Sequence, residues 1–294
     1  FNKVLDQFVR LYCSHHNRPS TAAETERLLR TAFLPHWESR DVRLIVRQDV
    51  LTILDAIVAR GAPSTANHAY AAIQKFFNWS VERGLIEISP CLHLKPPAKS
   101  QSRERVLSNK EIVTLWKASL TEGYPFGTIY QLLLLTAQRR GEVVGMRWAE
   151  LDLRQGVWTI PGARTKNGKA HSVPLTPRVR AILKSLPRFE SEFVFPGRGK
   201  PEQSYSGYSK GKRDLDAAAD LHDWTLHDLR RTAATGMAEL GVPPHVVEKI
   251  LNHSTGSFAG VAGVYNRFEY RSEMRSALRL WAAHVKKCVK GPSS

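Results

Sequence analysis

A short basic segment rich in proline and serine divides this chain into two parts with different residue patterns. The pair Pro96-Pro97 is followed by AKSQSRER, a composition that suits a linker better than a helix or a strand. The length of 294 residues is enough for two domains of ordinary size. We therefore expect a first domain over residues 1–95, a linker over 96–106 and a second domain over 107–294.

The first part carries only helical patterns. Apolar residues recur at helical spacing through residues 1–90, which predicts a small helical bundle. The second of its helices is expected to begin at Thr21-Ala-Ala-Glu24, which has the form of a capping box. The four expected helices cover about 1–12, 21–33, 48–60 and 64–83.

One side of the fourth expected helix is polar and thin, as a helix face lying against DNA would be. It carries Asn67, Gln74, Lys75 and Asn78. An ordinary solvent-exposed face would have the same composition, and the sequence does not separate the two interpretations. These four residues are our candidate DNA contacts in the first domain.

The second part mixes helical patterns with short strands. A hairpin is expected over 151–160, and a further strand over 170–175 follows the Asn167-Gly168 turn. Ser108-Asn-Lys-Glu111 has the form of a capping box. The expected helices cover about 109–120, 128–137, a short stretch after Arg139, 177–186, 208–220, 227–240, 243–251 and 272–287. This domain is therefore predicted to be mainly α with a small antiparallel β-sheet.

The charge of the chain favours a polyanionic partner. Lys and Arg number 43 and Asp and Glu number 27, which gives a net charge of +16 at pH 7. Phosphate groups attract such a surface, and the release of their counterions drives binding. The basic residues are scattered, so a broad positive face or channel is expected rather than a basic arm. A basic protein without a nucleic-acid function remains the alternative.

What the sequence lacks excludes several classes of protein. No apolar run is long enough to cross a bilayer, and no glycine-rich loop indicates nucleotide triphosphate binding. The three cysteines are too widely spaced for a disulfide framework or a zinc site. His222, Asp223, His227 and Asp228 are the best metal-ligand group, but adjacent arginines would repel a cation. We expect no metal and no cofactor.

Four segments carry side chains that can act on a phosphate. Arg139 follows a very apolar helix, and Glu142 lies three residues on, a spacing at which a carboxylate orients a guanidinium. Lys166 lies on the Asn-Gly turn of a hairpin. His227 and Arg230 share one helix face near a helix start, where anions bind readily.

The fourth segment is close to the end of the chain. His253 is followed, across a glycine-rich stretch, by Tyr265 in the sequence VYNR. Such a loop can deliver a tyrosine into a cleft, although a buried aromatic is the commoner fate of this residue type. Each of the four segments is ordinary when taken alone.

Together and in this order, the segments resemble the catalytic domain of the tyrosine recombinases, the phage integrase family. TAQRRGE, the turn lysine, HDLRRT, LNH and VYNR carry the resemblance, which covers residues 108–287. Residues 1–90 resemble, less specifically, the core-binding domain of that family. The resemblance implies two domains, a helical core-type DNA-binding bundle and an α+β catalytic domain.

The resemblance also implies a role for each candidate residue. Tyr265 would be the nucleophile that forms a 3′-phosphotyrosyl intermediate, and Lys166 would be the general acid that protonates the leaving 5′-oxygen. Arg139 and Arg230 would hold the non-bridging oxygens of the scissile phosphate. No ATP would be needed, because the intermediate stores the energy of the broken bond. No metal would be needed, because two arginines and two imidazoles would stabilise the charge of the transition state.

The remaining roles are supporting ones. His227 and His253 would donate hydrogen bonds or relay protons, and Glu142 would support the first arginine. The family often has Gly at two positions where this chain has Ala137 and Asn252. Both replacements are small or tolerate a left-handed backbone conformation, so activity is expected to be kept.

The resemblance implies site-specific integration or excision of a mobile element, such as a prophage or a genomic island. The implied partners are double-stranded DNA at attachment sites, a homotetramer on that DNA and accessory DNA-bending proteins, in the bacterial cytoplasm with the nucleoid. The start at Phe1, without an initiator Met, favours a fragment that has lost an upstream arm-binding domain. The apolar face of helix 272–287 would pack on a neighbouring protomer or, equally, on its own domain.

Three other functions remain open at this stage. A type IB topoisomerase-like enzyme uses related chemistry but relaxes DNA instead of exchanging strands. A catalytically silent DNA-binding protein is disfavoured because all six candidate catalytic residues are present. A metal-dependent nuclease is disfavoured because the chain has no carboxylate cluster suited to two metals.

Overall fold

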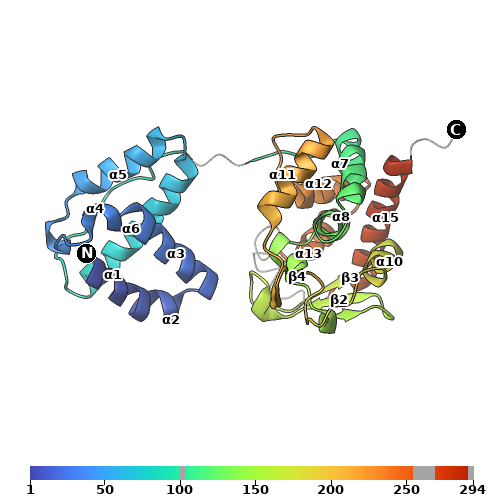
Figure 1. Ribbon diagram of the computed structural model, residues 1–294, viewed down its shortest axis with the longest axis horizontal. Coiled ribbons are helices and arrows are strands. Elements are labelled where there is room, and N and C mark those ends of the chain that lie inside the picture. Colours follow the sequence, from blue (N-terminus) through green and yellow to red (C-terminus); the bar gives the residue numbers. More distant parts are fainter. Residues whose placement is uncertain (100–102, 254–268, 291–294) are drawn as a thin grey trace. The chain divides into compact units, whose positions relative to one another are not determined.

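The computed structural model describes residues 1–99, 103–253 and 269–290. The chain divides into two compact units, Phe1–Arg103 and Glu104–Ser294 (Figure 1). Each unit has its own cluster of buried apolar side chains, as independently folding domains do. No helix in the described ranges is long and apolar enough to cross a membrane.

Helices are the regular elements of the first unit, and its described residues form no strand, as the sequence predicted. Its elements are α1 (Asn2–Phe8), the π-helical η1 (Val9–Cys13), α2 (Ser14–His16), α3 (Pro19–Ala32), α4 (Leu34–Trp37), the 3-10 helix η2 (Val42–Leu44), α5 (Arg47–Ala59) and α6 (Pro63–Glu82). α6 is the longest of them and supplies much of the core. Its Phe76 meets Phe8 of α1 edge to face, with ring centroids 5.5 Å apart, a favoured aromatic geometry.

The predicted start of the second helix is wrong. α3 begins after Arg18, with Pro19 in its first turn, and no side chain caps it. Proline suits that position because its fixed φ matches a helix and its missing N–H would have had no partner there. Glu24, expected to close a capping box with Thr21, instead forms an ion pair with Arg27 at 2.7 Å.

The second unit combines helices with two small antiparallel sheets. Its helical elements are α7 (Asn109–Glu122), α8 (Phe126–Thr136), α9 (Arg140–Val144), η3 (Trp148–Glu150), η4 (Gly162–Arg164), α10 (Pro177–Lys184), α11 (Tyr208–Ala219), α12 (Leu226–Glu239), α13 (Pro244–Ile250) and α15 (Arg271–Lys290). Its strands are β1 (Leu151–Asp152), β2 (Val157–Ile160), β3 (His171–Pro174), β4 (Pro196–Gly197) and β5 (Lys200–Ser204). The mainly α fold with a small antiparallel sheet is therefore confirmed.

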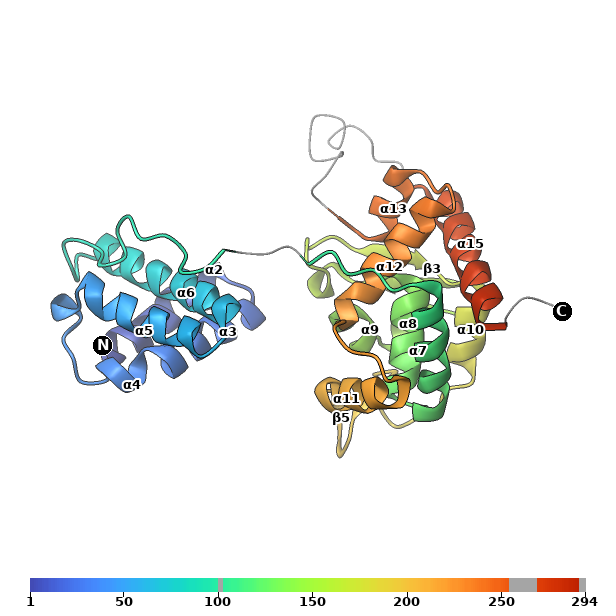
Figure 2. The same ribbon diagram turned by 90° about the horizontal axis from the view of Figure 1, so that it is seen from above.

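α8 is the central helix of this unit. All of its residues are buried, because it is apolar on every side and other helices surround it. α7, α9, α11 and α12 contact it, and Figure 2 shows α7 and α9 beside it. α8 ends at Thr136, and the next residue, Ala137, has a φ of +56°. This left-handed residue turns the chain sharply, so that Arg139 stands at the start of α9.

The three-stranded sheet has the order β1-β2-β3, with Trp158 opposite Val173. The predicted hairpin and the strand after the Asn-Gly turn are thus confirmed. The second hairpin, β4–β5, was not predicted. Its sequence around Gly197 and Pro201 contains breakers and polar residues, without the alternation of apolar side chains that marks a strand.

The structure also shows how α7 begins and where the apolar face of α15 packs. The predicted capping box at α7 is present, since the Ser108 N–H donates to Glu111 Oε2 at 2.8 Å. The apolar face of α15 packs on its own unit, where the indole Nε1 of Trp281 donates to the Leu134 carbonyl at 2.8 Å. A Cβ on Gly236 would lie 2.3 Å from the Trp281 ring, so α12 needs glycine at this contact.

Candidate catalytic site of the second unit

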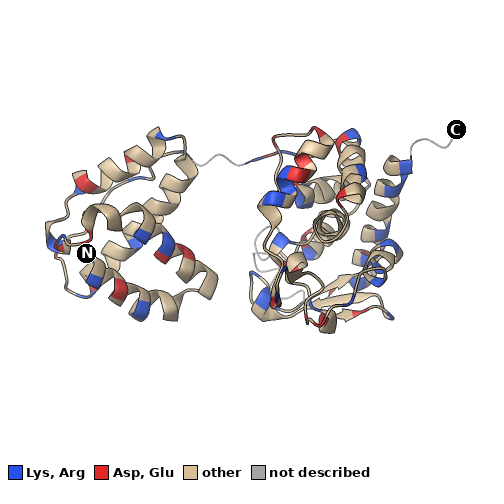
Figure 3. Ribbon diagram, viewed as in Figure 1, with Lys and Arg blue, Asp and Glu red and all other residues tan. Residues whose placement is uncertain are grey.

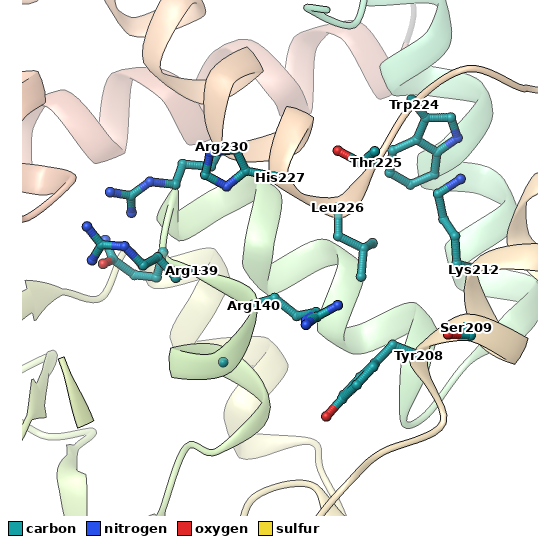
Figure 4. A pocket seen from close by; sticks show the side chains of 12 residues that line it. Arg139, Arg140, Tyr208, Ser209, Lys212, Trp224, Thr225, Leu226, His227 and Arg230 are labelled. Carbon is teal, nitrogen blue, oxygen red and sulfur yellow. The ribbon is translucent and has the colours of Figure 1, made fainter. Parts of the chain in front are cut away.

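A pocket of about 560 Å³ opens where the α8–α9 junction, α11 and the start of α12 meet (Figure 4). Three of the predicted site residues line it, namely Arg139, His227 and Arg230. Figure 4 shows the side chains of Arg139 and Arg230 next to each other, with His227 beside them. We call this space the arginine pocket. Residues from chain positions about ninety apart therefore come together as the sequence pattern predicted.

Arg230 is fixed by two backbone carbonyls. It is 3% exposed, its Nη1 donates to the Ala137 carbonyl at 2.7 Å, and its Nη2 donates to the Leu251 carbonyl. Burial, and secondly the charge of Arg139, lowers the pKa of Arg230 to about 10. The guanidinium therefore stays protonated at neutral pH, in an environment that screens its charge poorly.

Arg139 is held by the carboxylate three residues on. Glu142, which is 2% exposed, accepts from the Arg139 backbone N–H at 2.8 Å and from its Nη1 at 3.0 Å. Arg139 Nη2 also donates to the Asn252 carbonyl at 3.4 Å. A buried carboxylate with two bonds to one residue leaves Arg139 little rotational freedom, and the contact is the one that the spacing predicted.

The arginines next in sequence have other partners. Arg231 Nη1 donates to the buried Asp228 at 2.6 Å, in the first turn of α12. The hydroxyl of Thr225, which precedes the helix, also donates to Asp228. The guanidinium of Arg140 lies over the Tyr208 ring, 4.6 Å from its centroid. Arg139 and Arg230, rather than Arg140 and Arg231, therefore form the convergent pair.

His227 is the second residue of α12 and is exposed, at the rim of the arginine pocket. Desolvation, and then the charges of Arg230 and Arg231, lowers the pKa of His227 below its usual value. The imidazole is therefore mainly neutral at pH 7, and one ring nitrogen can donate while the other accepts.

Lys166 is not among the residues that line the arginine pocket. It is exposed on the loop between β2 and β3, next to Thr165, which is fully buried. In the same loop Asn167 Nδ2 donates to Asn252 Oδ1 at 2.7 Å. The loop thus contacts Asn252, whose carbonyl accepts a hydrogen bond from Arg139. His253 is the next residue after Asn252.

His253 lines a second pocket, of about 490 Å³, together with His171 and Asn252. Its Nδ1 lies 2.8 Å from Glu248 Oε2, which orients the ring. Asn252 joins the two pockets, because it lines the second one and binds Arg139 of the first. Tyr265 lies outside the described residues.

Two residues at this site were not predicted. His171 and Gln138 are both buried, and both contact the Ile250 carbonyl, through Nε2 atoms at 3.1 and 2.9 Å. Burial lowers the pKa of His171 to about 4. Strand alternation places His171 on the same face as the buried Val173, a signal that identifies it as an inward-facing polar residue.

The two positions at which the family often has Gly both have a left-handed backbone. Ala137 has a φ of +56° and Asn252 a φ of +49°. Their carbonyls bind Arg230 and Arg139 respectively. The left-handed turns thus present carbonyls to the arginine pair. Glycine adopts this conformation without strain and Asn adopts it more readily than most residues, whereas Ala137 adopts it at a steric cost from its Cβ.

The predicted DNA contacts of the first unit separate into two groups. Gln74, Lys75 and Asn78 line one shallow pocket on α6, and Lys75 and Asn78 are exposed. Asn67 instead forms two hydrogen bonds with the backbone of Ala98, at 2.9 and 3.0 Å. The prediction that Asn67 contacts DNA therefore competes with a role in holding the segment that leaves this unit.

Basic side chains occur on both units. Figure 3 shows Lys and Arg on helices of the first unit and on helices and loops of the second. In the described part of the chain no group of three or more His, Cys, Asp or Glu is arranged to hold a metal ion.

Comparison with known proteins identifies the class to which this fold and site belong. The Phage integrase family profile matches residues 105–268, and the Phage integrase central domain profile matches residues 1–96. The chain therefore belongs to the phage integrase family, the tyrosine recombinases, as the order of its motifs predicted.

Its relatives include named members of that family. Prophage integrase IntA of Escherichia coli K12 is 30% identical over 243 residues, which cover 80% of this chain and 58% of that protein. The shufflon-specific DNA recombinase of E. coli is 31% identical over 211 residues, covering 69% of this chain and 53% of that protein. The chain thus spans little more than half the length of these two relatives.

Solved structures share the fold. A lambda integrase tetramer bound to a Holliday junction superimposes with a TM-score of 0.70 at 17% identity, covering 87% of this chain and 77% of that one. At this level of identity the similarity establishes the architecture of the chain, which is the two-domain fold described above.

Proposed function

We propose that this chain is a site-specific DNA recombinase, which cleaves and rejoins DNA strands through a 3′-phosphotyrosyl intermediate and so integrates or excises a mobile element. The convergence of Arg139 and Arg230 in one pocket carries the proposal. Two guanidinium groups held side by side by backbone carbonyls have an anion as their natural ligand, and membership of the phage integrase family supports a phosphodiester as that anion.

The arginine pair acts on the non-bridging oxygens of the scissile phosphate. Negative charge grows on these oxygens as the phosphorus becomes five-coordinate. Since Arg230 is held by the Ala137 and Leu251 carbonyls, and Arg139 by Glu142, neither side chain has to reorganise when that charge develops. Preorganised donors of this kind are commonly the largest contribution to catalysis.

Tyr265 and Lys166 carry the covalent step. The Tyr265 phenolic oxygen bonds to phosphorus as the bond between phosphorus and the 5′-oxygen breaks, and Lys166 gives its proton to that oxygen. His227 and His253 accept the phenolic proton or donate to the phosphate. Attack by the 5′-hydroxyl of another strand then releases Tyr265 and reforms a phosphodiester, so the reaction needs no ATP. The arginine pair takes the place of a metal in stabilising the transition-state charge.

The partners follow from the same reaction. Exchange between two duplexes requires four active subunits, and lambda integrase forms a tetramer on a Holliday junction. We therefore propose a homotetramer on two attachment sites, with Gln74, Lys75 and Asn78 of α6 contacting DNA. Accessory DNA-bending proteins and a location in the bacterial cytoplasm, where the DNA lies, belong to this proposal.

The covalent intermediate gives the test. The chain is mixed, in EDTA, with a nicked duplex that carries the end sequence of its element, and the mixture is denatured in SDS. An adduct of protein and DNA is expected, and it should be absent with Tyr265→Phe. A chain that binds this duplex but neither cleaves it nor forms an adduct would be a silent DNA-binding protein, and strand cleavage that requires Mg²⁺ and leaves no adduct would indicate nuclease-type chemistry.

A further inference from the structure

The side chain of Arg164 connects the loop that carries Lys166 to the helix that carries the arginine box. Arg164 ends η4, and its Nη1 lies 2.5 Å from both carboxylate oxygens of Glu150. Its Nη2 donates to the Glu142 carbonyl of α9 at 2.7 Å. The side chains of Arg164 and Glu150 are only 18% and 5% exposed, so water competes little for these bonds.

Glu142 therefore accepts hydrogen bonds from two arginines. Its carboxylate holds Arg139, and its backbone carbonyl holds Arg164. Only Thr165 separates Arg164 from Lys166 in the chain. A continuous path of hydrogen bonds and covalent bonds thus runs from Arg139, through Glu142 and Arg164, to the backbone of Lys166.

Glu150 is itself fixed, which makes it a firm anchor. The Trp158 indole Nε1 donates to Glu150 Oε2 at 3.0 Å, and the fully buried Trp158 lies in β2. The guanidinium of Arg164 also passes close to the end of α9. A Cβ on Gly145 would lie 3.0 Å from Arg164 Nη2, so the glycine leaves the space that the Arg164 guanidinium occupies.

The loop that carries Lys166, between β2 and β3, has little conformational freedom of its own. Thr165 is fully buried, and its Oγ1 donates to the Lys169 carbonyl at 2.7 Å. A Cβ on Gly162 would lie 2.4 Å from the Gly168 carbonyl, so the two ends of the loop touch. On the far side of Lys166, Asn167 is bonded to Asn252. The exposed Lys166 thus lies between two anchored residues.

We infer that Arg164 is a positioning residue that sets the reach of Lys166 toward the leaving 5′-oxygen, by fixing the hairpin loop to the Glu142 carbonyl and to Glu150. The inference rests on the proposed function and on the general-acid role of Lys166 within it. Loss of the Arg164 link lets the loop move relative to Arg139, and proton transfer to the leaving oxygen depends steeply on such distances.

The test compares two leaving groups. In one nicked duplex the scissile phosphate is ordinary, and in the other the bridging 5′-oxygen is replaced by sulfur. A thiolate leaves without being protonated, so cleavage of the sulfur substrate does not need the general acid. Arg164→Met should slow adduct formation on the ordinary duplex by about ten-fold to a hundred-fold, at most the lower end of the roughly 10²–10⁴-fold that a general acid contributes, because Lys166 is misplaced and not removed. It should leave the sulfur duplex within about three-fold of the unaltered chain.

Two reference variants calibrate the result. Lys166→Ala should show the same pattern in stronger form, slow on oxygen and near normal on sulfur. Arg147→Met is the matched control, since Arg147 pairs with Glu192 at 3.2 Å, in the same region but outside the link to α9. It should cleave both substrates at the unaltered rate.

The folding of the variants is measured as well, because Met leaves the Glu150 carboxylate buried without its cation. If Arg164→Met unfolds, the double variant Arg164→Met/Glu150→Gln, which removes both charges, is used in its place. Both variants lack the bond to the Glu142 carbonyl, so both should be slow on the ordinary duplex. Both should cleave the sulfur duplex normally, because a thiolate leaves without a general acid.

Equal slowing of the Arg164 variant on both substrates, with Lys166→Ala restored by sulfur, would overturn the role of Arg164 and leave the proposed function intact. Failure of sulfur to restore Lys166→Ala would overturn the general-acid role and the inference with it. If the unaltered chain forms no adduct with either duplex, the proposed function itself fails.

Discussion

Arg230 shows how a single residue at this site combines structure with chemistry. Its two terminal nitrogens each bind a different carbonyl, those of Ala137 and Leu251, and a planar guanidinium can do this while presenting its charge to the pocket. A lysine ammonium is a point donor and cannot span both carbonyls. The identity of the cation therefore matters as much as its charge.

Arg230→Lys should lower the rate of adduct formation by about a hundred-fold, the effect of removing a preorganised donor, and destabilise the second unit by about 1–3 kcal/mol through the unpaired carbonyl. DNA affinity in a filter-binding assay should change little, because most of it comes from other phosphate contacts. Arg231→Lys is the matched control, since Arg231 binds Asp228 instead. Equal activity of the two variants would contradict this account of the pocket.

His171 predicts a dependence of stability on pH. Burial lowers its pKa from 6.5 to about 4, so between these values the unfolded chain binds a proton that the folded chain does not. Stability is therefore complete above about pH 6.5 and falls as the pH drops toward 4. Between pH 7.5 and 5.0 this loss should reach about 2 kcal/mol, at 1.4 kcal/mol per pH unit below 6.5.

The comparison is with His171→Gln, whose amide can still donate to the Ile250 carbonyl but does not titrate. Urea unfolding of the second unit at the two pH values measures the difference. The unaltered chain should lose about 2 kcal/mol more than the variant. Equal losses in the two proteins would mean that another group is responsible.

Some of these residue contacts were predictable from the sequence, and others were not. The pair Arg139–Glu142 is local, three residues apart on one short helix, so its spacing was enough. Arg164 contacts Glu142 and Glu150, which lie 22 and 14 residues away, and Gln138 contacts the Ile250 carbonyl, 112 residues away. Only the fold brings such residues together, so no spacing rule identifies them.

Among the elements, the end of α13 is the point at which the site is assembled. Three successive carbonyls, of Ile250, Leu251 and Asn252, accept hydrogen bonds from other elements. The donors are Gln138 and Arg139 after α8, Arg230 of α12 and His171 of β3. The last carbonyls of a helix have no partners within it, and here both arginines use such groups. The position of His253 is therefore tied to that of the arginine pair.

α6 supplies a prediction at the same scale. Lys75→Ala should weaken DNA binding and reduce the slope of log affinity against log salt concentration by about one, because one phosphate contact is lost. Asn67→Ala should leave the slope unchanged, since the Asn67 amide binds the Ala98 backbone. It should instead speed tryptic cleavage after Lys99, as the segment near Ala98 loosens. An unchanged slope in Lys75→Ala would remove α6 from the DNA interface.

Element prediction succeeded where the pattern was strong and failed where a turn decided the structure. α8 is apolar on all sides, and the Ser108 capping box is complete, so both were evident. The start of α3 was misplaced because Pro19 outweighed the Thr21 pattern. The β4–β5 hairpin was missed because its residues do not alternate.

At the scale of the whole molecule, the described residues form two units, each with its own buried core. The first unit offers a polar helix face, and the second holds the arginine pair. In the proposed function, the first unit would hold the DNA site and the second would activate the scissile phosphate. A topoisomerase-like enzyme could use the same centre, so the fate of the cleaved strand separates the two functions.

The most direct measurement uses a supercoiled plasmid with two copies of the joined end sequence of the element in direct orientation. The chain is added in EDTA, and the products are separated on an agarose gel after nicking. The account predicts two smaller circles from each plasmid, absent with Tyr265→Phe. Relaxed plasmid of the original length without smaller circles, or a reaction that EDTA abolishes, would contradict it.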